Sequence, residues 1–358
     1  MEEHAKKGDA VHLFSCRGGL LSCQQNIDHH YFTCGDCLRQ RALAMAKVEA
    51  KYAAFPFPVL TRAERCRLWK LPFRFQSMDE LRGFKYENFD VGEAVISSMV
   101  SRYRNPHQDP VFDVNLVRRL MISAVGIYLA LRRELKARDI RLMYVFNGRY
   151  ATHRAVLRAC QAEGVDCLVH DRGHDKDHYH LYQNQMIHDI APRVQEIKEY
   201  WDAADPERRE QIAAGFYNNR RKGIIPNWKS FTKEQQKALL PEEWSRTKRN
   251  IAIFVSSEDE FVAIGKEWRN ELYDQGQAAA IREIARDLAQ QDPSVHLWVR
   301  VHPNLKGVDN PFIRDLAKIS GANVTIIPAD SPVDSYALLD ACEKVVTFGS
   351  TMGIEAVF

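Results

Sequence analysis

The stretch that decides the expected fold is VVTFGSTMGIEAVF, residues 345–358. Its first four residues are apolar or β-branched and predict a buried strand, and Gly349, Ser350 and Thr351 are small and polar enough to end that strand and open a helix. At the carboxyl end of such a strand, backbone N–H groups and the helix dipole favour an anion, usually a phosphate. Glu355 is placed to accept hydrogen bonds from ribose hydroxyls. An ordinary capped helix packed on a sheet explains the same pattern.

The sequence before this stretch alternates in the same way. Strands are predicted at 251–255, 295–301 and 324–327, and helices at 278–290, 311–320 and 333–341. This alternation predicts a doubly wound, Rossmann-like domain over residues 249–358. Polar residues lie at the ends of the strands: Arg300 is near the end of the second strand, His302 follows that strand, and Ser331 follows the third. His302 is suited to donate to a phosphate or to stabilise charge on a leaving nucleotide, and it is equally suited to a structural hydrogen bond.

The first 248 residues are expected to form another Rossmann-like domain, with helical insertions. A strand at 11–15 precedes Gly18 and Gly19, which allow a tight turn and a close approach to a ligand. Long helices are expected within 38–69, at 113–137, 187–200 and 206–221. The strand at 142–146, the helix at 151–163 and the strand at 165–169 predict a right-handed βαβ unit.

Two polar turns follow the strands of this βαβ unit, NGR at 147–149 and HDRG at 170–173. Because the strands are parallel, both turns are predicted to lie at one edge of the sheet. Arg149 or Arg172 can clamp a phosphate or a sugar carboxylate, and Asn147 can hold a hydroxyl. Asp171 can act as a base. Either arginine can instead neutralise Asp171 or cap a helix.

Four cysteines near the N-terminus suggest a structural metal. Cys34 and Cys37 have the spacing of a zinc knuckle, and Cys16 and Cys23 precede them. The six residues between the first two match no common knuckle, so reduced structural thiols explain the pattern equally well, and a redox or iron–sulfur role less well. The histidine-rich stretch at 174–189, with His174, His178 and His180, is interpreted as the solvated start of a helix in preference to a metal site.

Composition excludes several classes of protein. A formal net charge of +3 over 358 residues does not favour a nucleic-acid partner. We find no apolar run that approaches the roughly 20 residues needed to span a bilayer. The N-terminal stretch MEEHAKKGDA lacks the apolar core of a signal peptide. A cytoplasmic location is therefore expected, with peripheral association at the inner face of the membrane.

A family resemblance rests on these motifs. RVHPN at 300–304 and SPVDSYALLDACEKVVTFGSTMGIEA at 331–356 are similar to the donor half of GT-B glycosyltransferases of bacterial capsule and surface polysaccharide synthesis. CRGGLLSCQQN, the CGDC pair, YVFNGRYATHRAVLRAC and VHDRG resemble the acceptor half of proteins in the same group. The resemblance implies two domains that face a cleft. It also implies that members continue past the position of Phe358, so the second domain is expected to be truncated.

The resemblance implies roles for the predicted residues. Donor phosphates would contact His302 and the Gly349–Thr351 turn, with Arg300 and Ser331 nearby, and Glu355 would bind the nucleoside sugar. Gly18, Gly19, Asn147, Arg149 and Arg172 would face the cleft. Asp171 is the expected base and His302 the second catalytic residue. No Asp-x-Asp sequence ends a strand of the second domain, so we expect metal-independent, inverting transfer without a required cofactor.

The expected partners are a nucleotide-sugar donor, a glycan or glycolipid acceptor and other polysaccharide-assembly proteins. Two alternatives remain open. A nucleotide-sugar 2-epimerase has the same architecture and would release free sugar without an acceptor. A catalytically silent carbohydrate-binding or assembly subunit would bind sugar or a partner and turn nothing over.

Overall fold

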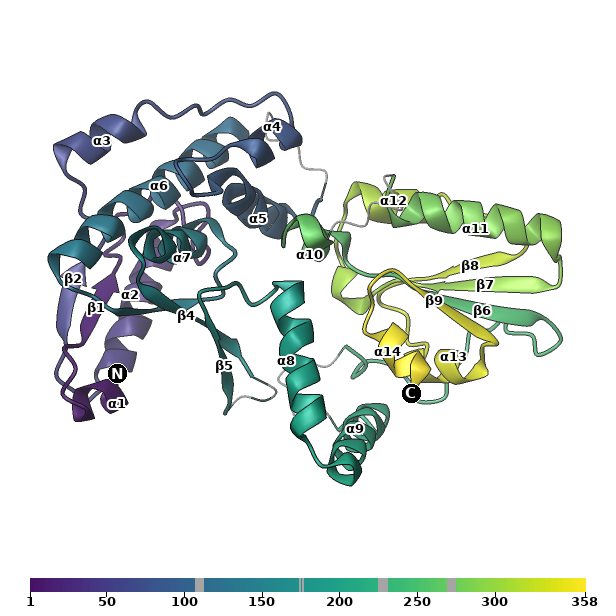
Figure 1. The fold of residues 1–358 in the computed structure, drawn as a ribbon. Coiled ribbons are helices and arrows are strands. Elements are labelled where there is room, and N and C mark those ends of the chain that lie inside the picture. Colours follow the sequence, from purple (N-terminus) through teal and green to yellow (C-terminus); the bar gives the residue numbers. More distant parts are fainter. Residues whose placement is uncertain (107–112, 174, 176, 225–230, 269–274) are drawn as a thin grey trace. The chain divides into compact units, whose positions relative to one another are not determined.

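The computed structural model describes residues 1–106, 113–173, 175, 177–224, 231–268 and 275–358. The chain divides into two compact units (Figure 1). Unit 1 comprises Met1–Asp171, Tyr179–Asp189 and Ala263–Gly265, and unit 2 comprises Arg172–His178, Ile190–Val262 and Lys266–Phe358. The grouping differs from the boundary expected at residue 248, because residues 190–248 belong with unit 2.

Unit 1 combines two small sheets with long helices. Strands β1 and β2 form a parallel pair, and β3, β4 and β5 form a sheet in that order, with β3 and β4 parallel. Its elements are α1 (Glu2–Lys6), β1 (His12–Ser15), α2 (Tyr31–Met45), β2 (Ala53–Pro56), α3 (Arg62–Leu68), α4 (Met78–Gly83), α5 (Val91–Tyr103), α6 (Val114–Ala137), β3 (Leu142–Phe146), α7 (Ala151–Glu163), β4 (Asp166–Arg172) and β5 (Tyr179–Gln183).

Helix α6 is the centre of the unit 1 core. It packs against α3, α5 and α7, and α7 packs on β3. From the sequence we found no run that could span a bilayer, but α6 is long and apolar enough to cross a membrane by length and composition. However, 72% of its most apolar window is buried inside the protein. Such burial is typical of a core helix. Gly92 on α5 allows a close approach, because a Cβ there would lie 1.7 Å from the carbonyl oxygen of Leu81.

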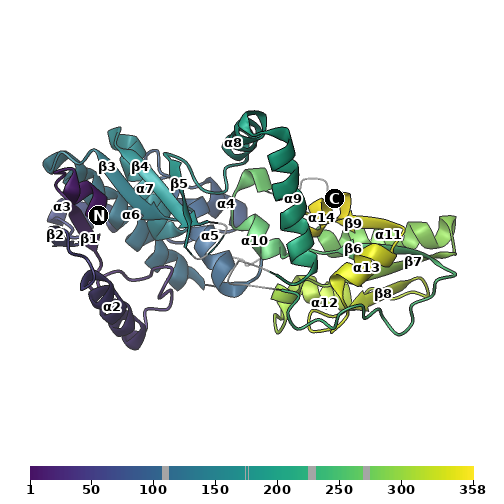
Figure 2. The same cartoon turned by 90° about the horizontal axis from the view of Figure 1, so that it is seen from below.

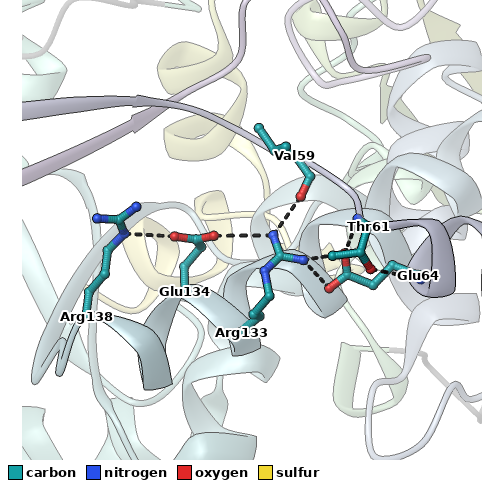
Figure 3. Close-up of polar contacts among 6 residues, drawn as sticks. All are labelled: Val59, Thr61, Glu64, Arg133, Glu134 and Arg138. Carbon is teal, nitrogen blue, oxygen red and sulfur yellow. Dashed lines mark hydrogen bonds and ion pairs between the residues drawn. The ribbon is translucent and has the colours of Figure 1, made fainter.

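A polar network joins α3 to α6 (Figure 3). The hydroxyl of Thr61 accepts the N–H of Glu64 at 3.2 Å, and the Glu64 carboxylate accepts the N–H of Thr61 at 2.7 Å, which makes a capping box. Arg133 on α6 donates to the same carboxylate and, at 2.7 Å, to the carbonyl of Val59. Burial raises the pKa of Glu64, but these hydrogen bonds outweigh it and the pKa is lowered.

Two predictions for unit 1 are wrong. Residues 170–172 are not a turn but continue β4 to Arg172. The stretch at 174–189 does not begin a helix, because Tyr179–Gln183 form β5 beside β4. The pairing of β5 with β4 explains both differences. Just after β5, the backbone N–H of Asn184 donates to the carbonyl of Cys167 at 2.8 Å, and the side-chain oxygen of Asn184 accepts the N–H of Cys167 at 2.7 Å. His174 lies outside the described residues.

Unit 2 is built on a four-stranded parallel sheet with the order β8-β7-β6-β9 (Figure 2). Its elements are α8 (Ile190–Ala203), α9 (Pro206–Arg221), β6 (Arg249–Phe254), α10 (Glu258–Val262), the 3-10 helix η2 (Lys266–Trp268), α11 (Gln277–Gln291), β7 (Val295–Arg300), the 3-10 helix η4 (Pro303–Leu305), α12 (Pro311–Ala317), β8 (Val324–Ile327), α13 (Ser335–Ala341), β9 (Lys344–Thr347) and α14 (Met352–Val357).

Both faces of the unit 2 sheet are buried. Alternate residues of β6 point to opposite faces, so Ile251 and Ile253 join a core with α11 and α12, whereas Ala252 and Phe254 join a second core with Trp298 and α13. Burial on both faces explains the nearly continuous apolar strands of this region. The α/β fold class and the doubly wound order of this unit are confirmed.

Helix α9 groups with unit 2 through contacts to its last elements. Arg220 pairs with Glu355 of α14 at 3.1 Å, and Arg221 pairs with Asp340 of α13 at 2.8 Å. The ring of Tyr217 stacks on Phe358, with ring centroids 4.5 Å apart. These partners lie more than a hundred residues after α9 in the chain, so the local sequence did not predict that α9 groups with unit 2.

Candidate functional site

The strand order of unit 2 contains a topological switch point. The chain runs from β6 to β7 and β8 on one side of β6, and then crosses to β9 on the other side, so the strand order reverses at β6. In open α/β sheets, ligands bind outside the carboxyl ends of the strands at such a point. Arg300 is the last residue of β7, and His302, Ser331 and the Gly349–Thr351 turn follow carboxyl ends of this sheet, as the sequence predicted.

Arg300 is buried and holds a loop. Its guanidinium donates to the carbonyl of Pro328 and, at 3.1 Å, to the carbonyl of Ser331. Burial lowers the pKa of Arg300 to about 10, against the opposite effect of Asp330. Arg300 therefore ties the end of β7 to the connection between β8 and α13, and this connection carries Ser331.

His302 precedes the 3-10 helix η4 and caps its N-terminus. Its Nδ1 accepts the N–H of Asn304 at 3.1 Å, and its ring lies edge-on to Phe231 with centroids 4.9 Å apart. Because Nδ1 is the acceptor, the neutral ring carries its proton on Nε2. An N–H donor at Nε2 suits the oxygen of a phosphate.

The turn after β9 is compact. Gly349 has φ +86°, and a Cβ there would lie 2.9 Å from the ring of Phe261. The hydroxyl oxygen of Ser350 accepts the N–H of Met352 at 3.3 Å, and Thr351 precedes α14. Ser331 accepts the N–H of Val333 at 3.3 Å in the same manner. Each serine keeps its hydroxyl proton for donation.

Glu355 is buried within unit 2. Its carboxylate accepts from Nε of Arg220 at 3.1 Å and from the hydroxyl of Tyr336 at 2.5 Å. Burial and the adjacent carboxylate raise the pKa of Tyr336 to about 12. A ribose bound by Glu355 would therefore share the carboxylate with Arg220 and Tyr336.

Two serines at the switch point were not among the predicted site residues. The hydroxyl of Ser256 donates to the carbonyl of Phe348 at 2.6 Å and so joins the ends of β6 and β9. The hydroxyl of Ser257 is buried and has no hydrogen-bond partner among the described residues. The sequence signal that could have identified them is a pair of small polar residues after a buried strand.

A pocket of about 580 Å³ lies elsewhere in unit 2. It lies at the amino ends of β6 and β9, opposite the predicted donor residues, and its lining includes Trp244, Lys248, Asn250, Cys342 and Glu343. Ligands of open α/β sheets bind at the carboxyl ends of the strands, so this pocket lies at the opposite edge from the candidate site.

In unit 1, the NGR turn and Asp171 lie together as predicted. Phe146 and His170 are paired across β3 and β4, and the side-chain amide of Asn147 donates to Asp171 at 2.8 Å. Arg149 donates to the hydroxyl of Tyr150 at 2.7 Å. Arg172 is exposed at the end of β4.

The glycines and cysteines lie near the end of β1. Gly18 has φ +81° and lies against Cys34, and its N–H donates to the sulfur of Cys16 at 3.2 Å. Gly19 follows it. Burial raises the pKa of Cys23, and Cys16 and Cys34 are close enough to raise it further. Cys37 is exposed on α2.

The fit of these cysteines to a metal is incomplete. In the part of the chain that the structure describes, no three Cys, His, Asp or Glu side chains are arranged to hold a metal ion. The sulfur of Cys34 accepts the side-chain N–H of Asn26 at 3.1 Å. A structural zinc therefore stays a prediction.

Comparison with known proteins supports a link to capsule synthesis. Residues 240–358, about a third of the chain, match a family model described as "Capsule polysaccharide biosynthesis protein", and this range contains the whole four-stranded sheet of unit 2. No curated protein matches the chain.

Two solved structures were found to be similar. One is a protein from Listeria monocytogenes described as a UDP-N-acetylglucosamine 2-epimerase, with 9% identity, 97% of this chain and 76% of that chain covered, and a TM-score of 0.24. The other is the S. aureus MnaA–UDP co-structure, with 12% identity, the same coverage and a TM-score of 0.25. Likenesses this weak carry no argument about this chain.

Proposed function

We propose that this protein is a glycosyltransferase that transfers a sugar from a nucleotide-sugar donor to a growing capsular or other surface polysaccharide. The observation that carries the proposal is the switch point of unit 2, where polar residues follow the carboxyl ends of all four strands within a segment similar to capsule polysaccharide biosynthesis proteins. A GT-B arrangement, with the acceptor on unit 1, is part of the proposal.

The nucleotide sugar would be held by uncharged hydrogen-bond donors and by one carboxylate. Nε2 of His302 and the hydroxyl of Ser350 would donate to phosphate oxygens, and Glu355 would accept from the ribose. Such donors stabilise the charge that develops on the leaving nucleotide without a metal ion.

Asp171 would be the base in unit 1. Asn147 donates to one of its oxygens at 2.8 Å and thereby fixes the carboxylate. As Asp171 removes the proton of an acceptor hydroxyl, that oxygen would form the new bond to the anomeric carbon, and the bond to the nucleotide phosphate would break. A single displacement inverts the anomeric configuration.

Product analysis tests the proposal. The chain is incubated with a panel of nucleotide sugars, with and without oligosaccharide acceptors, and the nucleotide, the free sugar and the extended acceptor are measured. We expect nucleotide release that depends on an acceptor, together with an extended product. Asp171→Asn should lower this rate by at least a hundredfold, whereas Asp139→Asn, an exposed carboxylate of unit 1, should leave it unchanged.

The alternatives give different products. An epimerase would release free sugar in the absence of an acceptor. A silent carbohydrate-binding or assembly subunit would release no nucleotide under any condition while still binding sugar. Either result, obtained with a folded sample, would contradict the proposed transfer.

A further inference from the structure

Arg149 differs from the other arginines near it because its partners are neutral. Its guanidinium donates to the hydroxyl of Tyr150 at 2.7 Å and to that of Ser97 at 3.5 Å, and it lies 4.4 Å from the centroid of the Tyr150 ring. Within the described residues no carboxylate forms an ion pair with it, and its buried Nε–H has no acceptor. By contrast, Arg154 and Arg158 on the next helix both bind Asp90.

The turn that carries Arg149 is held in one conformation. Asn147 and Gly148 have φ +63° and +79°, and a Cβ on Gly148 would lie 3.1 Å from Val169. Asn147 is buried, donates its N–H to the carbonyl of His170 at 2.9 Å and binds Asp171 through its side chain. Arg149 therefore projects from a fixed backbone, which reduces the entropy lost when it binds a ligand.

Three histidines surround this turn, and all are kept uncharged at neutral pH. Burial lowers the pKa of His188 to about 4, assisted by Arg149 and opposed by Asp171. Burial also lowers the pKa of His153 to about 4 and that of His170 below its ordinary value. The Nδ1 atom of His153 is buried and lacks a partner among the described residues. The surroundings of Arg149 therefore offer neutral hydrogen-bonding groups and one carboxylate, Asp171, which acts on all three histidines.

We propose that the Asn147–Arg149 turn is an oxyanion-binding site that takes a phosphate or a carboxylate group. The two terminal nitrogens of the Arg149 guanidinium form a fork that binds two oxygens of such a group. Asp171 lies beside the turn through Asn147, so a hydroxyl of the same molecule is brought toward the expected base. That the anion belongs to the acceptor rests on the proposed function; the anion site itself does not.

Titration calorimetry with two probes, inorganic phosphate and glucuronate, tests this site. We expect the wild-type chain to bind at least one of them, and Arg149→Met to weaken that binding tenfold or more. Arg149→Lys keeps the charge and loses the fork, so its affinity should lie between those of the wild-type chain and Arg149→Met. Arg141→Met removes an exposed arginine of the same unit and should change the affinity by less than twofold. The stronger probe identifies the anion as a phosphate or as a sugar carboxylate.

A second readout uses His188, which faces Arg149, Arg154 and Asp171. A bound anion favours its charged form, so its imidazole resonance, identified by its loss in His188→Gln, should titrate at a higher pH when the probe is present. No binding by the wild-type chain, or equal binding by a folded Arg149→Met variant, would overturn the anion site. Phosphate or glucuronate binding that needs Arg149, in a chain that binds no nucleotide, would retain the anion site and reject the glycosyltransferase.

Discussion

Two sheet edges of this molecule each carry an arginine, and the two arginines have different partners. At the carboxyl edge of the unit 2 sheet, Arg300 is the last residue of β7 and donates to the carbonyls of Pro328 and Ser331. At the β3–β4 edge of unit 1, Arg149 follows a strand, and its partners are the hydroxyls of Tyr150 and Ser97. A polar residue at the end of a strand can therefore hold the fold or remain available to a ligand, and only its contacts distinguish the two.

The largest effect on the free energy of unfolding is expected at Asp90, whose carboxylate forms ion pairs with two arginines of the fold. It accepts from Arg154, which is 2% exposed, and from Arg158 at 2.7 Å. Asp90→Ala leaves a buried arginine without its partner and should lower the free energy of unfolding by about 3 to 5 kcal/mol. Urea unfolding measures the change. A loss below about 1 kcal/mol would show that Arg154 does not need this carboxylate.

The same variant has a pH signature. Burial raises the pKa of Asp90, but the hydrogen bond from Arg158 and the charges of Arg154 and Arg158 outweigh it and lower the pKa to about 2. A lowered pKa contributes stability above the unfolded value of about 3.9 that is lost as the pH falls toward 2. The difference between wild type and Asp90→Ala should therefore shrink between about pH 4 and pH 2. A difference that stays constant over this window would contradict the assigned cause.

A smaller effect is expected at Arg300. Arg300→Met removes two hydrogen bonds to loop carbonyls and keeps most of the buried volume, so we expect a loss of about 2 kcal/mol. Arg246→Met, at the rim of the pocket on the opposite edge of the sheet, is the control. If Arg300→Met were as stable as wild type, the arginine would not be holding the loop, and the contrast with Arg149 would be lost.

The smallest effect on stability is expected at Arg149. Arg149→Met gives up hydrogen bonds to two partly or fully buried hydroxyls but breaks no ion pair of the described residues, so it should cost about 1 kcal/mol or less. Urea unfolding beside Arg300→Met makes the comparison direct. A loss at Arg149 larger than that at Arg300 would mean that Arg149 serves the fold.

The local sequence predicted the elements of both units better than their partners. The apolar runs at Leu142–Phe146 and Val324–Ile327 gave the strands β3 and β8, and the βαβ pattern brought Asn147 to Asp171. β5 was missed because its pairing with β4 outweighs the local polarity of a histidine-rich stretch. The sequence did not predict which arginine holds the fold, because the two carbonyls that accept from Arg300 lie about 30 residues further along the chain.

The central claim is that the switch point of unit 2 binds a nucleotide, and thermal unfolding with CMP, CDP, UDP, GDP and TDP tests it most directly. At about 100 times its dissociation constant a nucleotide should add roughly 2.7 kcal/mol of stability. We expect a shift with one nucleotide that is lost in His302→Ala and Ser350→Ala and weakened in Ser257→Ala, and that is retained in Ser294→Ala at the amino edge of the same sheet. No shift with any nucleotide, or a shift that survives the first two substitutions, would contradict the account.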